Sequence, residues 1–413
     1  MQGEKLGLDS YRQVVGDRVV GELYRLADRL RGSSVQHVNS TRAGGGVAEI
    51  LERLTPLTNE LEIRAHWDVI EGEDEFWRVT KMFHNAIQGD EVDFTSADFD
   101  TYIKWNRLNS QKIDLFGDCV FIHDPQPAAL IERRKPGTRQ RFVWRCHIDA
   151  STPMPRAWRF LEQFVRRFDA SIFSAPQFAQ SQLRIPQFLI APSIDPLSPK
   201  NRPLSADQVE SVLERFHVDR RRPILLQVSR FDRFKDPIGV IRAYRMVKET
   251  NDCQLVLAGG SATDDPDGAA VLVEVQEEAV GDPDIHVLVL PPDAHFEINA
   301  LQRGASIVLQ KSLREGFGLT VSEALWKGKP VVGGATGGIP LQILDGVNGY
   351  LVYSPEGAAF RIRYLLNHPE VASEMGRRGV EMVRQNFLLT RNLREYLMVI
   401  HAAQEPRRGI IEL

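Results

Sequence analysis

Short runs of β-branched and aliphatic residues alternate along this chain with longer stretches whose apolar positions have helical spacing. Ten of these runs are predicted to be strands, in two groups of five. The first group covers residues 35–39, 65–70, 119–123, 142–147 and 188–191, and the second covers residues 224–229, 254–258, 286–290, 306–310 and 330–332. Nearly continuous apolar strands alternating with helices are typical of parallel sheets covered on both faces. The pattern therefore predicts an α/β fold of two doubly wound, Rossmann-like domains.

A proline-rich segment separates the two groups of strands. Residues 191–199 read Ala-Pro-Ser-Ile-Asp-Pro-Leu-Ser-Pro, and these prolines exclude a continuous helix. We therefore expect an N-terminal domain over residues 1–193 and a C-terminal domain over residues 194–385, with a central cleft between them as the ligand site. The apolar positions of residues 386–413 permit a further helix.

Length, charge and cysteine content narrow the class of protein. A chain of 413 residues is too long for one ordinary core, which agrees with two domains. Its net charge of -4 provides no basic field for nucleic acid or an anionic membrane, and no apolar run is long enough to span a bilayer. The three cysteines show no C-x-x-C spacing, so neither a disulfide framework nor a zinc site is indicated. We expect a cytoplasmic protein without nucleic-acid or membrane partners, and a homodimer is left open.

A glycine-rich segment follows the first predicted strand. Thr41-Arg42-Ala43-Gly44-Gly45-Gly46 precedes a stretch with helical spacing, so its backbone N–H groups would lie at a helix N-terminus, where the helix dipole favours phosphate. Gly45 and Gly46 are therefore candidate phosphate-binding residues. The alternative is an ordinary flexible turn between a strand and a helix.

Two basic residues follow the strand at residues 224–228. Arg230 and Lys235 come after its carboxyl end, which is where ligands bind in open α/β sheets. A guanidinium fork and a compact ammonium together suit a pyrophosphate whose charge grows as it leaves. The alternative is a surface cluster paired with Asp232 and Asp236.

A second glycine loop follows the strand at residues 306–310. Gly316 and Gly318 permit a tight turn ahead of a helix that we expect to begin near Thr320 and to end near Gly328. Backbone amides at the start of that helix would point at an anion. The candidate anion-binding residues are Gly316, Phe317, Gly318 and Leu319.

Two carboxylates flank this loop. Glu315 precedes it and Glu323 follows it, and an anion-binding loop has use for carboxylates only if they bind hydroxyl groups. Each has an alternative explanation. Glu315 is also compatible with a solvated loop charge, and the spacing of Thr320 and Glu323 matches a capping box, in which the glutamate satisfies a backbone N–H.

Together these motifs resemble a known family. The E-x7-E spacing of Glu315 and Glu323, the G-F-G sequence between them, and the upstream Ser-Arg-Phe…Lys are similar to the retaining GT-B glycosyltransferases of family GT4. Residues 38–50, 123–130 and 144–149 resemble the trehalose glycosyltransferring synthases, so the similarity extends over nearly the whole chain. The resemblance implies transfer of glucose from an NDP-glucose donor to free glucose, with retention, to give α,α-trehalose.

The resemblance also implies roles for the donor-side residues. Arg230 and Lys235 would stabilise the leaving diphosphate, and the two glycine loops would hold phosphate oxygens. Glu323 would bind the ribose hydroxyls and Glu315 a hydroxyl of the donor glucose. His147 would lie beside the donor sugar, although a neutral histidine satisfied at a strand end is the commoner fate of a lone histidine.

The acceptor side is less well marked. The residues that the resemblance and their places after strands suggest are Glu71, His123, Asp124 and Gln126. Asp124-Pro125-Gln126-Pro127 is also compatible with a rigid turn. The family further implies that the last helix crosses back to the first domain. Residues 333–338 depart from the trehalose-type pattern, because no basic residue follows the strand there.

The resemblance implies no cofactor and no metal, because Arg, Lys and helix N-termini replace the Mg²⁺ of enzymes with an Asp-x-Asp motif. NDP-glucose is a substrate, and the partners are this nucleotide sugar and a small sugar acceptor. Asp98-Phe99-Asp100 matches that motif, and chance explains the match at least as well as function. Two other functions stay open: a trehalose phosphorylase that uses phosphate and glucose 1-phosphate, and a non-catalytic nucleotide-sugar-binding protein. The sequence does not decide among UDP, ADP and GDP.

Overall fold

The computed structural model describes residues 6–42, 46–260, 266–404 and 410–412. The chain divides into two compact units. Unit 1 consists of Met1–Ser193 and Leu389–Leu413, and unit 2 consists of Ile194–Leu388. The first boundary lies inside the proline-rich segment. The second lies three residues later than the sequence analysis placed it, because Ile194 donates a backbone hydrogen bond to Phe387 at 2.9 Å and thereby holds residues 386–388 in unit 2.

Unit 1 contains a seven-stranded, all-parallel sheet in the order β13-β6-β5-β4-β3-β1-β2. Its strands are β1 (Ser34–Asn39), β2 (Arg64–Val69), β3 (Cys119–His123), β4 (Arg141–Arg145), β5 (Ala170–Phe173), β6 (Gln187–Leu189) and β13 (Ile410–Glu412). Its α-helices are α1 (Arg12–Val15), α2 (Asp17–Ala27), α3 (Gly46–Glu60), α4 (Asp74–Ile87), α5 (Ser96–Lys112), α6 (Pro155–Val165) and α15 (Leu389–Gln404).

Unit 2 contains a six-stranded parallel sheet in the order β12-β11-β10-β7-β8-β9. Its strands are β7 (Ile224–Val228), β8 (Gln254–Gly259), β9 (Ile285–Val289), β10 (Ile307–Gln310), β11 (Val331–Gly334) and β12 (Gly349–Val352). Its α-helices are α7 (Ala206–Arg215), α8 (Pro237–Lys248), α9 (Pro266–Ala279), α10 (His295–Gly304), α11 (Leu319–Trp326), α12 (Ile339–Gln342), α13 (Pro355–Asn367) and α14 (Pro369–Asn386).

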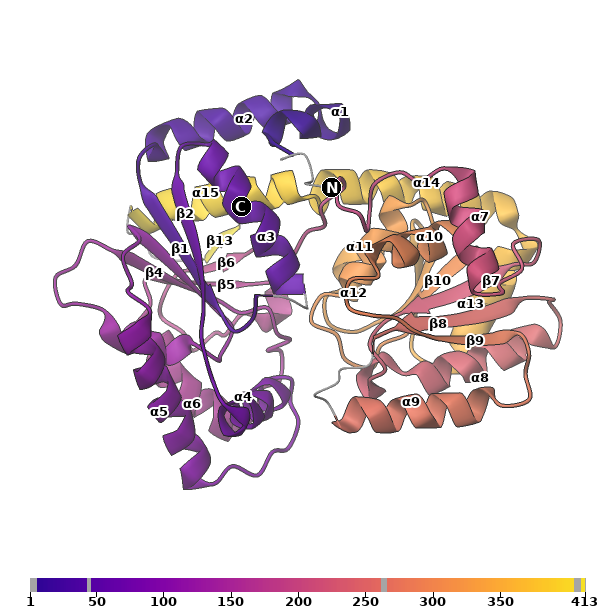
Figure 1. Cartoon of the computed structure of the whole chain (residues 1–413), viewed down its shortest axis with the longest axis horizontal. Helices are drawn as coiled ribbons and strands as arrows, with labels where there is room; N and C mark the ends of the chain where they lie inside the picture. The colour runs from indigo at the N-terminus through magenta and orange to yellow at the C-terminus, as the bar shows by residue number, and fades with distance from the viewer. Residues whose placement is uncertain (1–5, 43–45, 261–265, 405–409, 413) are drawn as a thin grey trace. The chain divides into compact units, whose positions relative to one another are not determined.

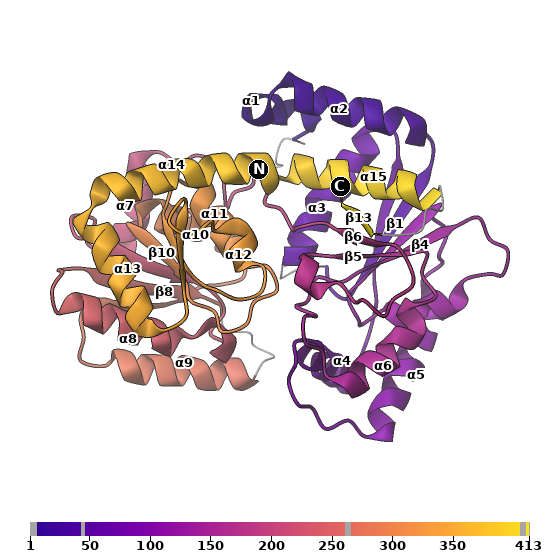
Figure 2. The same ribbon diagram turned by 180° about the vertical axis from the view of Figure 1, so that it is seen from behind.

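Helices cover both faces of each sheet. In unit 1, α2, α3 and α15 lie on one face and α4, α5 and α6 on the other; in unit 2, α8 and α9 lie on one face and α7 and α10 on the other (Figures 1 and 2). Every residue of β1, β3, β7, β8 and β10 is buried, as the continuous apolar pattern requires. The predicted α/β fold of two Rossmann-like units is confirmed.

The predicted strands are all present, and three further strands complete the sheets: β5, β12 and β13. The helix predicted near the C-terminus is α15, which belongs to unit 1. Arg391 on α15 donates to the carbonyl of Ala191 at 2.7 Å, and Arg394 pairs with Glu22 of α2 at 2.7 Å. No helix in the described part of the chain is long and apolar enough to cross a membrane.

Candidate active site

The candidate donor residues of unit 2 lie at one edge of its sheet. Strands β7 and β10 are neighbours and run parallel, so the loops that follow them meet at the carboxyl edge. Arg230 and Lys235 follow β7, whereas Glu315 and the G-F-G loop follow β10. The structure therefore brings together the residues that the sequence analysis grouped.

A partly buried ion pair joins the two loops. The Lys235 Nζ lies 2.7 Å from Oε2 of Glu315, and these side chains are 18% and 9% exposed. The same oxygen accepts from Nε2 of Gln310 and from the hydroxyl of Ser312, each at 3.1 Å. Glu315 is thus an ordered carboxylate, which excludes the solvated loop charge.

The backbone around Lys235 is fixed by its neighbours. Gln227 of β7 donates to the Lys235 carbonyl at 2.7 Å. Asp236 adopts left-handed backbone angles, caps α8 through the amide of Gly239 at 3.1 Å, and pairs with Lys311. Lys235 itself pairs with Glu315 and not with Asp236. The alternative of a surface cluster in which Asp236 pairs with Lys235 is therefore wrong.

Arg230 has a different environment. Its side chain is 56% exposed and lies 3.9 Å from Asp232, a distance at which the guanidinium retains most of its capacity for another anion. Asp232 also accepts the amide of Phe234 at 2.7 Å and so shapes the short 3-10 turn Arg233–Lys235.

The G-F-G loop ends at the N-terminus of α11. This helix begins at Leu319, one residue before the expected start, and its N-cap is Gly318 at φ 82°. Among the described residues, the N–H groups of Phe317 and Gly318 have no protein acceptor. Gln342 stabilises the loop, because its Nε2 donates to the carbonyl of Phe317 at 2.6 Å. Free amides at a helix N-terminus are suited to binding phosphate.

A glycine pair packs directly against this loop. A Cβ on Gly337, at φ 53°, would lie 1.6 Å from the carbonyl oxygen of Glu315, and a Cβ on Gly338 would lie 2.7 Å from Cα of Phe317. Gly338 also donates to the carbonyl of Gly316 at 3.1 Å. These two glycines after β11 are therefore required by a close approach of two backbones.

Glu323 does not form the capping box that its spacing with Thr320 suggested. The N-cap of α11 is Gly318, which has no side chain. The Glu323 carboxylate is 6% exposed, lies 3.6 Å from Nζ of Lys200, and accepts from Nε2 of Gln302 at 3.4 Å. That explanation is wrong because the N-cap of α11 is Gly318, two residues before Thr320, which makes Glu323 the fifth residue of the helix and not the third.

The candidate residues of unit 1 lie at the carboxyl edge of its own sheet. Three histidines from β1, β3 and the residues after β4 form a chain: Nδ1 of His37 is 3.0 Å from Nε2 of His123, and Nδ1 of His123 is 2.9 Å from Nε2 of His147. Burial lowers the pKa of His37 to about 3 and the pKa of His123 and His147 well below the ordinary value. Neutral rings share one proton at each contact, so the tautomer of one ring fixes the next.

Asp124 holds the last histidine in place. It adopts left-handed angles with φ 65°, and its Oδ1 accepts the backbone N–H of His147 at 2.7 Å. Burial raises the pKa of the Asp124 carboxyl to about 7, against the hydrogen bond from His147 and the charge of Arg145, which lower it. Asp124 therefore orients the stretch of backbone that carries the His147 ring.

The segment Asp124-Pro125-Gln126-Pro127 forms a rigid turn, which is the alternative to acceptor binding that the sequence left open. Tyr102 donates its hydroxyl to the carbonyl of Pro125 at 2.6 Å, and Asn106 donates to the carbonyl of Gln126 at 3.0 Å. The side-chain oxygen of Gln126 is buried without a partner in the described part of the chain. A turn of this kind is compatible with ligand binding, since it leaves that acceptor unsatisfied.

The remaining candidates are placed less favourably. Glu71 follows β2, is exposed, and forms an ion pair with Lys112 of α5. Gly46 is the first residue of α3, which follows β1, whereas Gly45 lies outside the described residues. Asp98 of the Asp-x-Asp match is buried, caps α5 together with Thr95, and pairs with Arg78 at 2.6 Å, so its role is structural.

Sequence reasoning missed several buried polar residues that position the candidates. His37 and Lys311 are the clearest, since each contacts a partner far away in the sequence. The available signal was a polar residue inside or directly after an otherwise apolar strand: Val35-Gln36-His37-Val38 and Val308-Leu309-Gln310-Lys311. Such residues are rarely buried without a purpose.

Unit 2 thus offers an exposed guanidinium, a partly buried ammonium and the amides at the start of α11 as donors to an anion, and the carboxylates of Glu315 and Glu323 can accept hydrogen bonds from hydroxyl groups. Unit 1 offers an uncharged imidazole chain and a carboxyl with a pKa of about 7. The first set is suited to a departing diphosphate, and the second to a neutral polyol.

Comparison with known proteins gives matches over most of the chain. The family model "Trehalose synthase, N-terminal domain" matches residues 37–180, and "Glycosyl transferases group 1" matches residues 211–382. A trehalose synthase of Pyrococcus horikoshii is 46% identical over 403 residues, covering 96% of this chain and 97% of that protein. A trehalose phosphorylase of Pleurotus pulmonarius is 30% identical over 396 residues, and the match covers 83% of this chain but 54% of that protein.

The solved structures agree on the fold. An α,α-trehalose-phosphate synthase (UDP-forming) from Burkholderia vietnamiensis superposes with a TM-score of 0.70 at 14% identity, covering 91% of this chain and all of that chain. At this identity the likeness shows the GT-B fold alone.

Proposed function

Because the chain belongs to the trehalose synthase family of GT-B glycosyltransferases, we propose that it transfers glucose from an NDP-glucose donor to free glucose, with retention, to give α,α-trehalose. The observation that carries the donor half of this proposal is the Lys235–Glu315 pair beside the N-terminus of α11. It combines a cation and open amides for a diphosphate with a carboxylate for a sugar hydroxyl.

The reaction is a substitution on one face of the donor sugar. The bond between C1 of glucose and the diphosphate oxygen breaks, and a bond from C1 to the acceptor hydroxyl oxygen forms on the same face. The proton of that hydroxyl passes to the departing phosphate oxygen, so no protein base is consumed. Arg230, Lys235 and the amides of Phe317 and Gly318 stabilise the charge that grows on the diphosphate.

The carboxylates and histidines position the sugars. Glu315 accepts a hydroxyl of the donor glucose through the oxygen that is not used by Lys235, Gln310 and Ser312. Glu323 accepts the ribose hydroxyls. His147 is neutral and therefore forms a directional hydrogen bond to a sugar without adding charge near C1.

The choice of acceptor is supported by the polar groups of unit 1 and by the similarity to the relatives. The Pyrococcus relative, named trehalose synthase, matches nearly its whole length, and Asp124 and Gln126 supply the polar groups that a sugar requires. We propose glucose as the acceptor and no metal requirement, because the cations of unit 2 supply the charge.

A screen of donors against acceptors tests this function. UDP-, ADP- and GDP-glucose are each incubated with glucose and other free sugars, with and without EDTA, and the anomeric configuration of the product is read by NMR. Formation of α,α-trehalose at an unchanged rate in EDTA is expected. An inverted linkage, or complete loss of activity in EDTA, contradicts the proposal.

Trehalose phosphorolysis is a second candidate, favoured by the 30% identity with the Pleurotus phosphorylase. The chain spans about half the length of that relative. Incubation of trehalose with inorganic phosphate or with an NDP separates the two functions. Glucose 1-phosphate from the first reaction indicates a phosphorylase, and NDP-glucose from the second indicates the synthase run in reverse.

A further inference from the structure

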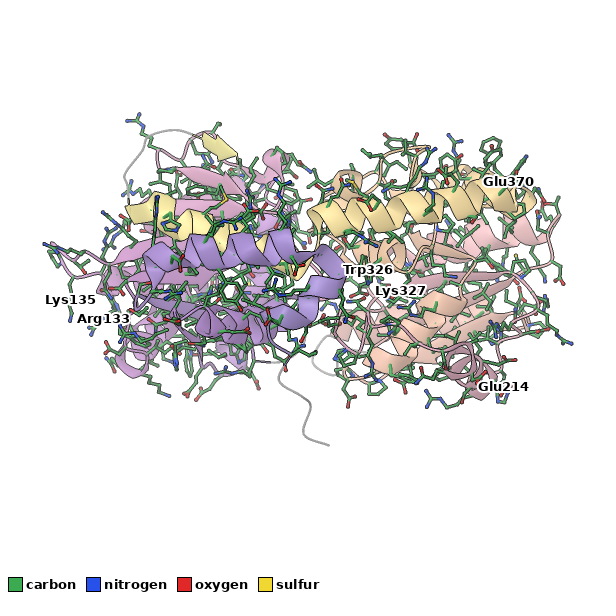
Figure 3. The ribbon with its side chains drawn as sticks, turned by 90° about the horizontal axis from the view of Figure 1, so that it is seen from above. Arg133, Lys135, Glu214, Trp326, Lys327 and Glu370 are labelled. Atoms are coloured by element: carbon green, nitrogen blue, oxygen red, sulfur yellow. The ribbon has the colours of Figure 1, made fainter. Side chains whose placement is uncertain are left out.

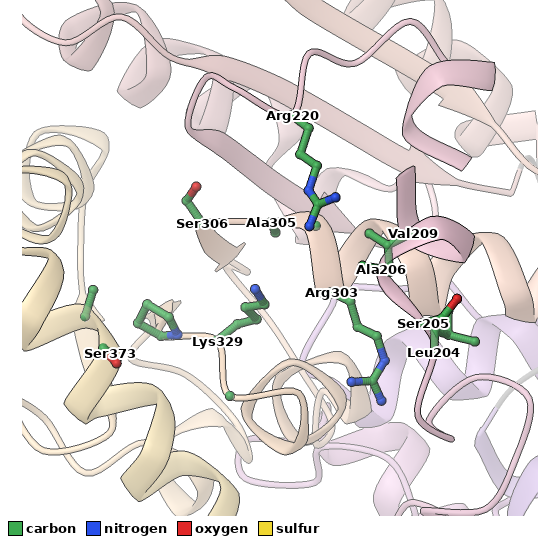
Figure 4. Close-up of a pocket in the computed structure, with 14 residues that line it drawn as sticks. Leu204, Ser205, Ala206, Val209, Arg220, Arg303, Ala305, Ser306, Lys329 and Ser373 are labelled. Atoms are coloured by element: carbon green, nitrogen blue, oxygen red, sulfur yellow. The ribbon is translucent and has the colours of Figure 1, made fainter. Parts of the chain in front are cut away.

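A cavity of about 550 Å³ lies in unit 2 at the edge of the sheet opposite the candidate donor site (Figure 4). Ala305 and Ser306 line it directly before β10, and Lys329 and Pro330 line it directly before β11. The strands are parallel, so these residues mark the amino edge. β10 has four residues, which separates the two edges by about 13 Å.

The cavity wall is basic. Arg220, Arg303 and Lys329 line it, and none of the lining residues is an aspartate or a glutamate; every one of them lies in the described part of the chain. Figure 4 shows the Arg220 guanidinium and the Lys329 ammonium extending toward the same space. A concave site lined by charge of one sign attracts a counter-ion.

Two of these charges are not neutralised by the protein. Lys329 forms no side-chain hydrogen bond or ion pair with any described residue, and burial together with the charges of Arg303 and Arg220 lowers its pKa. Arg303 donates to Asn299 and to the carbonyls of Asn201 and Arg202, but to no carboxylate. Arg220 pairs with Glu210 at 2.9 Å, and both side chains are about half exposed.

The other polar groups of the cavity can donate hydrogen bonds. Ser205, Ser306 and Ser373 line it with hydroxyls, and Ser205 is the N-cap of the ten-residue helix α7. The Ser306 hydroxyl oxygen accepts the amide of Ile224 at 3.2 Å, which leaves its own proton free to be donated. Several donors around two unneutralised cations match a group with several anionic oxygens.

From the unpartnered Lys329 and the acid-free basic wall, we propose that this cavity is a second anion site, which binds the phosphate group of a phosphate monoester. A phosphate monoester carries about -1.5 to -2 charges at neutral pH, which is opposite in sign to the charge of the cavity wall. The volume is also within the range of small-molecule sites, so a sugar monophosphate fits as well as inorganic phosphate.

Titration calorimetry with the full-length protein tests the site. The two probes are inorganic phosphate and glucose 6-phosphate, and they distinguish the phosphate group alone from a sugar phosphate. In Lys329→Gln we expect the affinity to fall at least about tenfold, because a charge-assisted hydrogen bond is lost. The matched control is Lys135→Gln, which removes an exposed lysine from a loop of unit 1 (Figure 3).

The candidate donor site also attracts phosphate, so Arg230→Gln is measured in parallel. Binding that survives in Arg230→Gln and Lys135→Gln but is lost in Lys329→Gln supports the proposal. Binding lost only in Arg230→Gln, an equal loss in all three variants, or no binding of either probe at millimolar concentration overturns it.

A second variant guards against misfolding of Lys329→Gln. Ser373 lies exposed on α14 at the cavity wall, so Ser373→Glu places a carboxylate there without altering the core. It should abolish phosphate binding while leaving the unfolding midpoint unchanged. Undiminished binding in Ser373→Glu contradicts the site. These are binding measurements, so their outcome is independent of whether the chain makes trehalose.

Discussion

The two basic residues after β7 are set in different surroundings, and this separates their contributions to catalysis and to stability. Arg230 is 56% exposed, whereas Lys235 is 18% exposed and paired with Glu315. Arg230→Ala should lower turnover about a hundredfold, with a free energy of unfolding within about 0.5 kcal/mol of wild type. Lys235→Ala should lower turnover similarly and also cost about 2 kcal/mol of stability, because it leaves Glu315 buried without its cation.

Steady-state kinetics and urea unfolding measure these two quantities. Arg233→Ala is the control, because Arg233 lies between the two residues in the sequence, on the turn that carries Lys235, and is exposed. Near wild-type turnover in both Arg230→Ala and Lys235→Ala would remove these residues from the mechanism.

The histidine chain gives the protein a defined response to acid. The pKa of His37 is about 3 in the folded protein, against 6.5 for an unperturbed histidine in the unfolded chain, so the unfolded state binds more protons between these values. Stability from this residue is therefore complete above pH 6.5 and is lost as the pH falls toward 3. When the pH falls from 7 to 5, the free energy of unfolding of wild type should fall by about 2 kcal/mol more than that of His37→Gln.

Urea unfolding at the two pH values tests this prediction. The control is His66→Gln, since the side chain of His66 is 54% exposed and lies outside the histidine chain. An unchanged pH dependence in His37→Gln would show that burial does not lower the pKa of His37, which would contradict the prediction.

Sequence motifs identified the candidate donor residues, which the structure brings together, but not the residues that hold them in place. Arg230, Lys235 and Glu315 stand in short segments directly after strands, and the parallel topology then brings those segments together. His37 could not be assigned from sequence, because its function depends on a contact 86 residues away. The capping box at Glu323 failed because the N-cap of α11 lies two residues before Thr320, and a spacing of three residues indicates a capping box only when its first residue is the N-cap.

At the level of elements, the turn into α11 depends on one glycine conformation. Gly318 has φ 82°, and a Cβ there would lie 3.2 Å from Cγ of Glu315. Gly318→Ala should destabilise the protein by about 1–2 kcal/mol and should also weaken nucleotide binding, since the loop amides move. The matched control is Gly137→Ala, with φ 72° and no atom within 4 Å of the added Cβ.

Thermal unfolding and calorimetry with UDP, ADP and GDP compare the two glycine variants. The backbone cost is common to both, so the loss of nucleotide affinity should appear only in Gly318→Ala. Equal nucleotide affinity in the two variants would argue against these amides as phosphate donors.

The strands were largely predictable, because burial on both faces of a parallel sheet requires continuous apolar runs. The strands that were missed are short and give weak patterns. β5 and β12 have four residues each, with a serine in the first and a glycine in the second, and β13 has three. They are strands because β5 and β13 pair with β6, and β12 pairs with β11. These pairings depend on the fold and are not visible in the sequence.

At the level of the whole molecule, unit 1 is completed by residues from the far end of the chain. The buried residues Leu393, Leu397, Val399 and Ile400 lie on α15 and belong to the core of unit 1. Deletion of residues 389–413 should therefore unfold unit 1, while unit 2 keeps its fold because all of its segments lie between Ile194 and Leu388.

Hydrogen exchange read by mass spectrometry checks this expectation. Protection should disappear from β1 and α3 and persist in β7 and β8. Leu397→Ala is a milder variant and should cost about 2–5 kcal/mol in unit 1 alone. Uniform loss of protection in both units would show that they fold together.

The backbone contact between Gly337–Gly338 and the G-F-G loop constrains how this enzyme can be redesigned. Ser312, Glu315 and Phe317 crowd the Cβ positions of Gly334, Gly337 and Gly338 in turn, so side chains are sterically excluded there. A library meant to introduce a new cation for another nucleotide sugar should therefore diversify Ala335 and Thr336, the partly exposed positions of that turn, and leave the glycines fixed.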